Sequence, residues 1–139
     1  MRVFLAGVMQ ASNYGKELFD QSYRQHIAGA LRARWPDVEV IDPLLLHPNS
    51  VDYDDAAARE TLFAMAELAA QSDLVVAYLP VASMGTALEM YMAYQQGTPV
   101  LTISPLEANW AVRALSRRIF STMQDFIAYV ETAPELAGF

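Results

Sequence analysis

The stretch LVVAYLPVASMGTALEMYMAYQQGTPVLTIS, residues Leu74–Ser104, contains two apolar runs on either side of a helical segment. LVVAY and VLTIS have the length and the branched side chains of buried strands, whereas residues 85–96 have the length of a helix. Two strands connected through a helix form a right-handed βαβ unit, and its strands lie parallel in one sheet. This stretch therefore predicts an α/β fold.

The rest of the chain continues this alternation. Further strands are predicted at residues 2–6, 38–41 and 117–120, and further helices at residues 16–35, 109–116, 123–132 and from a cap at Asp54 or Asp55 to residue 71. A length of 139 residues suits one compact domain. We predict a single domain over residues 1–139, a flavodoxin-like or Rossmann-like three-layer sandwich with a five-stranded, mainly parallel sheet.

Composition restricts the possible functions. Hydrophobic residues make up 54% of the chain and the net charge is −7, so this is a globular protein without the basic surface of a nucleic-acid binder. Cysteine is absent, which excludes disulfides, thiolate metal sites and cysteine nucleophiles. His26 and His47 have no third ligand at metal-site spacing, and no glycine-rich nucleotide motif occurs, so we expect neither a metal nor a cofactor. Without a long apolar stretch or a signal-peptide pattern, we expect no membrane span and a cytoplasmic location.

The loops that follow the predicted strands contain small and polar residues. In a parallel sheet, ligands bind beyond the carboxyl ends of the strands, near the point where the strand order reverses. Such loops can offer hydroxyl, amide and backbone N–H groups to a phosphate or a sugar, although each of these residues also has an ordinary role in a turn. The candidates are Gln10, Ser12 and Asn13 after the first strand and Ser83, Gly85 and Thr86 after the third.

Glu89 is an isolated acid in the apolar segment LEMYMAY. One interpretation is structural, because Thr86 and Glu89 fit a capping box in which the glutamate bonds the backbone at the start of the helix. The other is functional: we expect Glu89 in the first turn, partly buried, and kept ionised by the helix dipole. An ionised, partly desolvated carboxylate at the ligand-binding edge of a sheet is a competent nucleophile. The two roles are compatible.

Three further groups of residues have a functional interpretation beside a structural one. They are the acids Asp42, Asp52, Asp54 and Asp55, the arginines Arg113, Arg117 and Arg118, and the aromatic residues Tyr14, Tyr53 and Trp110. A solvated helix start, a solvated helix face and core or interface packing are the preferred explanations. A magnesium site, a phosphate contact and base stacking are the alternatives.

Three segments resemble the nucleoside 2-deoxyribosyltransferase superfamily: VFLAG at Val3–Gly7, Ser72–Ile103, and NW at Asn109 and Trp110. The resemblance covers the order of elements along the whole domain and is most specific over residues 72–103. It implies that Glu89 attacks the anomeric carbon of a deoxyribose, displaces the base and forms a covalent glycosyl ester, which water or a second base resolves.

The resemblance also implies a substrate and an assembly. Glu89 lies six residues after Ser83, where the superfamily's nucleoside transferases have an aspartate and its 2'-deoxynucleoside 5'-monophosphate N-hydrolases have a serine. This favours a nucleoside 5'-monophosphate, with Ser83 on the phosphate and with Phe4, Gly7, Gln10, Ser12, Gly85 and Thr86 as further contacts. The superfamily forms homodimers or higher homo-oligomers in which a neighbouring subunit completes the pocket, and Asn109 matches the residue that does so.

Two positions depart from the superfamily pattern. Phe4 stands where a tyrosine contacts the catalytic glutamate, and Met65 stands where an acid is the candidate proton donor, with Glu67 as the nearest acid. These departures support an alternative function, a nucleotide-binding sensor or regulatory module without turnover. The string GTALE also resembles the cytokinin-activating phosphoribohydrolases, but their preceding PGG is absent, so this interpretation ranks lower.

Overall fold

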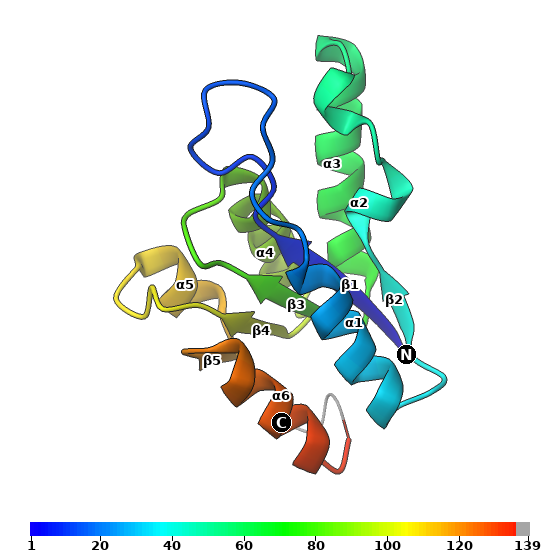
Figure 1. The fold of residues 1–139 in the computed structure, drawn as a ribbon, viewed down its shortest axis with the longest axis vertical. Coiled ribbons are helices and arrows are strands. Elements are labelled where there is room, and N and C mark those ends of the chain that lie inside the picture. Colours follow the sequence, from blue (N-terminus) through cyan, green and yellow to red (C-terminus); the bar gives the residue numbers. More distant parts are fainter. Residues whose placement is uncertain (136–139) are drawn as a thin grey trace.

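A computed structural model describes residues 1–135 (Figure 1). The strands are β1 (Arg2–Gly7), β2 (Glu39–Ile41), β3 (Leu74–Tyr78), β4 (Val100–Ile103) and β5 (Arg118–Phe120). The helices are α1 (Tyr23–Arg34), α2 (Pro43–Leu46), α3 (Asp55–Gln71), α4 (Met84–Gln95), α5 (Trp110–Leu115) and α6 (Met123–Thr132), with a 3-10 turn, η1, at Ser50–Asp52.

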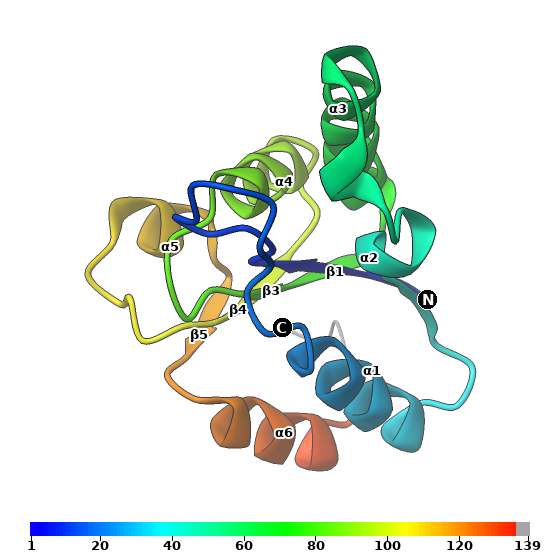
Figure 2. The same ribbon diagram turned by 45° about the horizontal axis from the view of Figure 1, so that its top comes forward.

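The five strands form one sheet in the order β2-β1-β3-β4-β5, and every neighbouring pair is parallel. Helices α1 and α6 cover one face of the sheet, and α3, α4 and α5 cover the other (Figure 2). The predicted three-layer α/β sandwich is therefore confirmed, with a sheet that is parallel throughout the described residues.

The central strands are apolar because both of their faces are covered. Alternate residues of β1 enter different cores: Val3 and Leu5 pack under α1 and α6, whereas Phe4 and Ala6 pack under α3 and α4. The first core is rich in large side chains, including Phe126, whereas α3 and α4 approach the sheet through small alanines. This close approach brings α3 and α4 together beside the carboxyl ends of the strands (Figure 2).

The predicted helix over residues 16–35 is wrong in its first part, because the helix begins only at Tyr23. Side chains in the preceding segment bond the backbone instead of leaving it to a helix, which is the usual effect of short polar residues. The Asn13 amide donates to the Glu17 carbonyl (2.9 Å), and the Asp20 carboxylate accepts from the Ser22 N–H (3.0 Å). Residues 8–22 consequently form a long loop above the end of β1 (Figure 1).

The segment between β2 and α3 is predicted as a loop, but it contains two short elements, α2 and η1. Asp42 caps α2 by accepting from the Leu44 N–H at 3.0 Å, and Pro43 supplies the fixed backbone angle suited to a first helical position. Asp54 caps α3 by accepting from the Ala57 N–H at 2.8 Å.

Replacing Phe126 by alanine tests the core under α1 and α6. Phe126 is fully buried, and its ring lies 5.5 Å from that of Phe120 in an edge-on arrangement. We expect Phe126→Ala to lower the free energy of unfolding by about 3–5 kcal/mol in urea titrations, because it creates a cavity. Phe63→Ala, at a site 59% exposed on α3, should change it by less than about 1 kcal/mol. Equal losses in the two variants would contradict this description of the core.

Candidate active site

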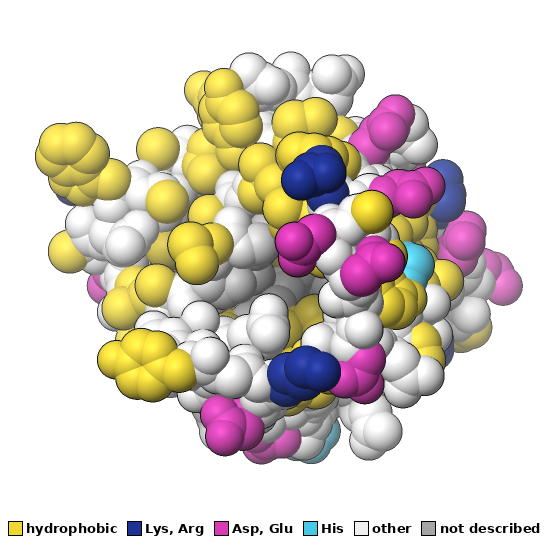
Figure 3. Space-filling view, turned by 90° about the horizontal axis from the view of Figure 1, so that it is seen from above, with side chains coloured by type: hydrophobic (Ala, Val, Ile, Leu, Met, Phe, Trp, Pro, Cys, Tyr) yellow, Lys and Arg dark blue, Asp and Glu magenta, His cyan; other side chains and the backbone are white. Residues whose placement is uncertain are grey.

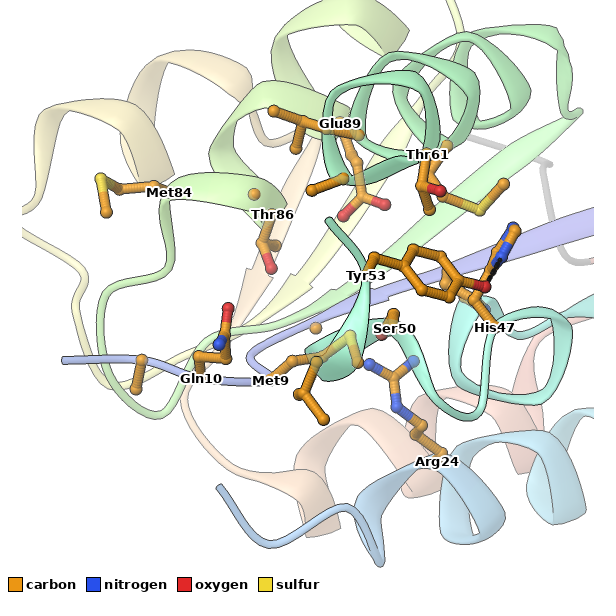
Figure 4. A pocket seen from close by; sticks show the side chains of 18 residues that line it. Met9, Gln10, Arg24, His47, Ser50, Tyr53, Thr61, Met84, Thr86 and Glu89 are labelled. Atoms are coloured by element: carbon orange, nitrogen blue, oxygen red, sulfur yellow. Dashed lines mark hydrogen bonds between the residues drawn. The ribbon is translucent and has the colours of Figure 1, made fainter. Parts of the chain in front are cut away.

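The order of the strands reverses between β1 and β3, because the chain goes outward from β1 to β2 and then returns to β3. A cavity of about 440 Å³ lies beyond the carboxyl ends of these strands. Its walls come from the loop after β1, from α1, from residues 43–53, and from the beginnings of α3 and α4 (Figure 4). The site is therefore where a parallel sheet usually binds its ligand.

Glu89 projects into this cavity from the second turn of α4 (Figure 4). The helix begins at Met84, and the Ser83 hydroxyl oxygen caps it by accepting from the Thr86 N–H (3.3 Å) and from the Thr86 hydroxyl (2.9 Å). The predicted capping box, with Thr86 as cap and Glu89 in the first turn, is therefore wrong. Ser83 starts the helix three residues earlier, so Glu89 lies too deep to bond the free N–H groups at the helix start.

The side chain of Glu89 is mostly buried, and its carboxylate has no protein partner among residues 1–135. The residue is 8% exposed, and it makes no hydrogen bond or ion pair with any of residues 1–135. Burial raises the pKa of Glu89 from 4.5 to about 8, and the positive charge of Arg24 opposes this shift. The expectation that the helix start keeps Glu89 ionised stays a prediction, and burial acts against it.

Four of the other predicted contacts line the cavity with Glu89: Gly7, Gln10, Gly85 and Thr86. Gly7 is a glycine for packing reasons, since a Cβ there would lie 2.2 Å from the Tyr23 hydroxyl oxygen. Gly85 has no such constraint: it is helical, and a Cβ would meet nothing within 4 Å. Gly85 is therefore a helical residue and not a turn glycine. Its missing side chain leaves free space beside Thr86.

Four predicted contacts are not among the residues that line the cavity. Phe4 is fully buried in the core under α4, and a side chain without exposed surface cannot contact a ligand, so this prediction is wrong. Ser12 is exposed in the first loop, and Ser83 caps α4. Asn109 is exposed and caps α5 by accepting from the N–H groups of Ala111 and Val112.

Arg24 is not among the predicted contacts, yet it lines the cavity from α1 and is 3% exposed. Its Nη1 donates to Asp42 Oδ1 at 3.0 Å, and its Nε donates to Gln21 Oε1 at 2.8 Å. A signal was available: Arg24 precedes Ile27, Ala28 and Leu31 at the spacing of the apolar face of a helix. A charged residue on such a face is buried with a purpose or a partner.

Residues 43–53 supply a second polar group to the cavity. His47 Nδ1 lies 2.8 Å from the Tyr53 hydroxyl oxygen, and both side chains line the cavity (Figure 4). Base stacking is the alternative role of Tyr53 in the sequence, and its ring faces the cavity beside Ser50 (Figure 4). Nothing in the periodicity of this segment identifies His47 in advance, because the segment is irregular.

The acidic residues considered for magnesium are engaged separately. Asp42 pairs with Arg24, Asp52 pairs with Lys16 at 2.9 Å, and Asp54 caps α3. Residues 1–135 contain no group of three or more His, Cys, Asp or Glu side chains arranged to hold a metal ion. No helix within the same residues combines the length and the apolar character that crossing a membrane requires.

Two solved structures share this fold. A 2-deoxyribosyltransferase from the psychrotolerant bacterium Bacillus psychrosaccharolyticus matches with a TM-score of 0.68 and 18% identity, over 98% of this chain and 100% of that one. A conserved protein from Enterococcus faecalis V583 matches with a TM-score of 0.65 and 19% identity, over 94% of this chain and 97% of that one. No family model and no curated protein matches the sequence. The protein therefore has the fold of a 2-deoxyribosyltransferase along nearly its whole length.

The pKa of Glu89 predicts how stability depends on pH. The folded-state pKa, about 8, lies above the ordinary value of 4.5, so the folded protein binds the proton more tightly than the unfolded chain does. Stability from this group is fully present below about pH 4.5 and is lost as the pH rises through 8, at up to about 1.4 kcal/mol per pH unit. Glu89→Gln, which cannot ionise, should match the wild type near pH 4.5 and exceed it by a few kcal/mol at pH 8 in urea titrations.

The exposed Glu67 on α3 provides the control. Glu67→Gln should leave the difference from the wild type almost independent of pH, since its carboxylate stays in water in both states. A stability difference between Glu89→Gln and the wild type that does not grow between pH 4.5 and 8 would show that the Glu89 carboxylate is hydrated.

Proposed function

We propose that this protein cleaves the N-glycosidic bond of a deoxynucleoside or of its 5'-monophosphate, with Glu89 as the nucleophile. The observation that carries the proposal is the Glu89 carboxylate itself. It is buried, free of protein partners, and directed into a cavity at the reversal point of the sheet (Figure 4). A 2-deoxyribosyltransferase with the same fold adds support.

In the proposed reaction, a carboxylate oxygen of Glu89 forms a bond to the anomeric carbon, and the bond from that carbon to the base nitrogen breaks. The base leaves with the electron pair of the broken bond and takes up a proton from solvent water. The transition state resembles an oxocarbenium ion, which the negative charge of Glu89 stabilises. Water or a second base then attacks the same carbon and releases the carboxylate. The ionised form of Glu89 is therefore the reactive one, and its poor hydration makes it a stronger nucleophile.

The cavity suits a nucleoside in size and lining. Its volume of about 440 Å³ is within the usual range for small-molecule sites. Met9, Leu62 and Met65 offer an apolar surface to a base, and the Tyr53 ring offers a stacking surface. Gln10, Gly85 and Thr86 provide polar groups and close backbone approach for the sugar. We place the base against the apolar wall and the sugar against the start of α4.

Ser83 remains the proposed phosphate contact. Its hydroxyl oxygen accepts two hydrogen bonds from Thr86, but its own hydrogen has no acceptor among residues 1–135. That hydrogen can donate to a phosphate oxygen at the start of α4, where the helix dipole favours an anion. Ser12 is proposed as a further contact from the exposed first loop.

We also propose that the protein acts as a homodimer or higher homo-oligomer, with residues 1–139 as a single domain. Large apolar side chains are exposed, among them Met84 in the cavity wall at 89% and Trp110 at the start of α5 at 82%. Hydrophobic side chains gather on this end of the molecule (Figure 3). Such surfaces commonly mark interfaces. Asn109 is next to Trp110, so an interface here would carry Asn109 toward a neighbouring cavity.

A nucleotide-binding module without turnover is the second candidate. Two observations favour it: Met65 lines the cavity without offering a proton, and the raised pKa of Glu89 keeps most of the carboxyl protonated at neutral pH. General acid catalysis usually contributes about 100- to 10,000-fold, so the absence of an acid at Met65 is costly for a poor leaving group.

Base release from the purified protein tests the proposed function. The protein is incubated with 2'-deoxynucleosides and their 5'-monophosphates, with and without an acceptor base, and free base is measured by chromatography. We expect release by the wild type and a loss of about 1,000-fold or more in Glu89→Gln, because the nucleophile is removed. Glu67→Gln is the control with unchanged release. Mass spectrometry of the quenched reaction should find one deoxyribosyl group on the peptide that contains Glu89.

Two outcomes would decide against catalysis by Glu89. Tight binding of a nucleotide without release of base would favour the non-catalytic module. Release from Glu89→Gln at the wild-type rate would mean that another group is the nucleophile.

Gly85→Ala tests whether a ligand occupies the space beside Gly85. An alanine fits without a clash and should raise the free energy of unfolding by about 0.5–1 kcal/mol, as in other helices. The same methyl group should slow base release by raising KM. Gly29→Ala is the matched control, because Gly29 is helical in α1, has equal room and does not line this cavity. Equal release by the two variants would exclude a ligand at Gly85.

A further inference from the structure

Arg24 is the only permanently charged residue among those that line the cavity. It rises from α1 on the wall opposite α4, and its guanidinium points into the space below the Glu89 carboxylate (Figure 4). At 3% exposure it is as buried as a core residue.

The guanidinium of Arg24 is held firmly but is not saturated. A guanidinium has five N–H donors. Nε uses one on Gln21 and Nη1 uses one on Asp42, and the group also lies 5.0 Å from the centre of the Tyr23 ring. The other three donors have no acceptor among residues 1–135. The side chain is therefore fixed in place while part of its positive edge stays available to the cavity.

Glu89 presents the complementary group. Its carboxylate has no hydrogen bond within residues 1–135, and no nitrogen of Arg24 lies within the 4.0 Å of an ion pair. The two charges thus face each other across open cavity (Figure 4). The positive charge of Arg24 favours the charged form of Glu89, which is the direction expected for opposite charges that line one cavity.

We propose that Arg24 is a positioning residue whose fixed positive charge favours the ionised form of Glu89 that attacks the sugar. Its catalytic consequence rests on the proposed function, whereas the coupling between the two charges does not. The direction agrees with the electrostatics, because Arg24 is the group that lowers the pKa of Glu89 against the effect of burial. Without Arg24, burial would act alone and the nucleophile would be protonated over a wider pH range.

No other residue that lines the cavity carries a permanent positive charge that could favour the ionised form of Glu89. The first loop contributes Met9 and Gln10 to the cavity, and α3 contributes Thr61 and Met65, all without charge. Burial raises the pKa of Tyr23 above its ordinary value, so its phenol stays neutral.

The segment 43–53 adds two titratable groups, His47 and Tyr53, which bond each other. His47 gains a charge only when it takes up a proton, and the variant His47→Gln removes that contribution from the measurement.

Asp42 provides a control of opposite sign. It fixes Arg24 but also offsets part of its charge. Asp42→Asn keeps an oxygen that accepts from Arg24 and that caps α2, while the negative charge disappears. If charge is what matters, Arg24→Gln should raise the pKa of Glu89 and Asp42→Asn should lower it. A merely structural role would move both variants in the same direction.

The experiment follows the Glu89 carboxyl by NMR of protein labelled with ¹³C at the glutamate side-chain carboxyl, titrated from pH 5 to 10 in the His47→Gln background. We expect Arg24→Gln to raise the pKa by about one unit or more, Arg24→Lys to stay near the parent value, and Asp42→Asn to lower it. Arg32→Gln, an exposed position on α1, should have no effect. The acid limb of kcat/KM for base release should move with the NMR value in each variant.

The outcomes separate the two proposals. Unchanged titration of Glu89 in both Arg24→Gln and Asp42→Asn would overturn the role of Arg24, even if the wild type releases base. Shifted titration without base release by the wild type would retain the charge coupling and overturn the catalytic part together with the proposed function. Rates that fall in Arg24→Lys as far as in Arg24→Gln would also contradict a role based on charge.

Discussion

Parallel pairing of β1 with β3 determines where everything else at this site can lie. The register brings Gly7 opposite Tyr78 at the last step of the ladder. Tyr78 stacks on Tyr23 with ring centres 4.3 Å apart, and the Tyr23 hydroxyl donates to the Val8 carbonyl at 2.9 Å. Because Gly7 has no side chain, Tyr23 can pass directly over the end of β1. The start of α1 is thereby fixed to the sheet, and Arg24 is the next residue along that helix.

The same site works against the stability of the fold. Burial raises the pKa of Glu89, so its ionisation costs folding free energy, and a protein selected for stability alone would have an apolar residue there. The arrangement around Arg24 has the opposite character, since its charge is paired and its bonds are well made. The rule that buried ionisable groups have a partner is thus broken at Glu89 and obeyed at Arg24. This is the pattern expected at a functional site.

The layers of the fold were predictable because the strands are apolar runs of strand length separated by helices, a pattern that leaves little choice of topology. The beginning of α1 was not, since Asn13 and Asp20 bond the backbone locally and override the helical tendency of the residues around them. The position of Glu89 along α4, counted from the start of the helix, depends on whether Ser83 or Thr86 caps it. Sequence patterns do not resolve that choice, because both residues are good caps.

The cavity itself was only partly predictable. Its floor and its α4 wall follow from the rule on strand ends, and Gly85, Thr86 and Glu89 were identified that way. Arg24, His47 and Tyr53 come from other segments and meet Glu89 only through tertiary packing. The partner of Arg24 is 18 residues away at Asp42, a distance at which no local pattern links two charges.

The two halves of helix α3, which forms one wall of the cavity, differ in how deeply they are buried. Its second half packs on the sheet through Ala66, Ala69 and Ala70, whereas none of residues 55–65 is buried, and this first half projects past the sheet (Figure 1). That projecting half supplies Thr61, Leu62 and Met65 to the cavity wall. A helical segment with so few buried contacts opens locally at a much lower free energy than the core does. The cavity therefore has one wall whose local opening costs less free energy than disruption of the sheet.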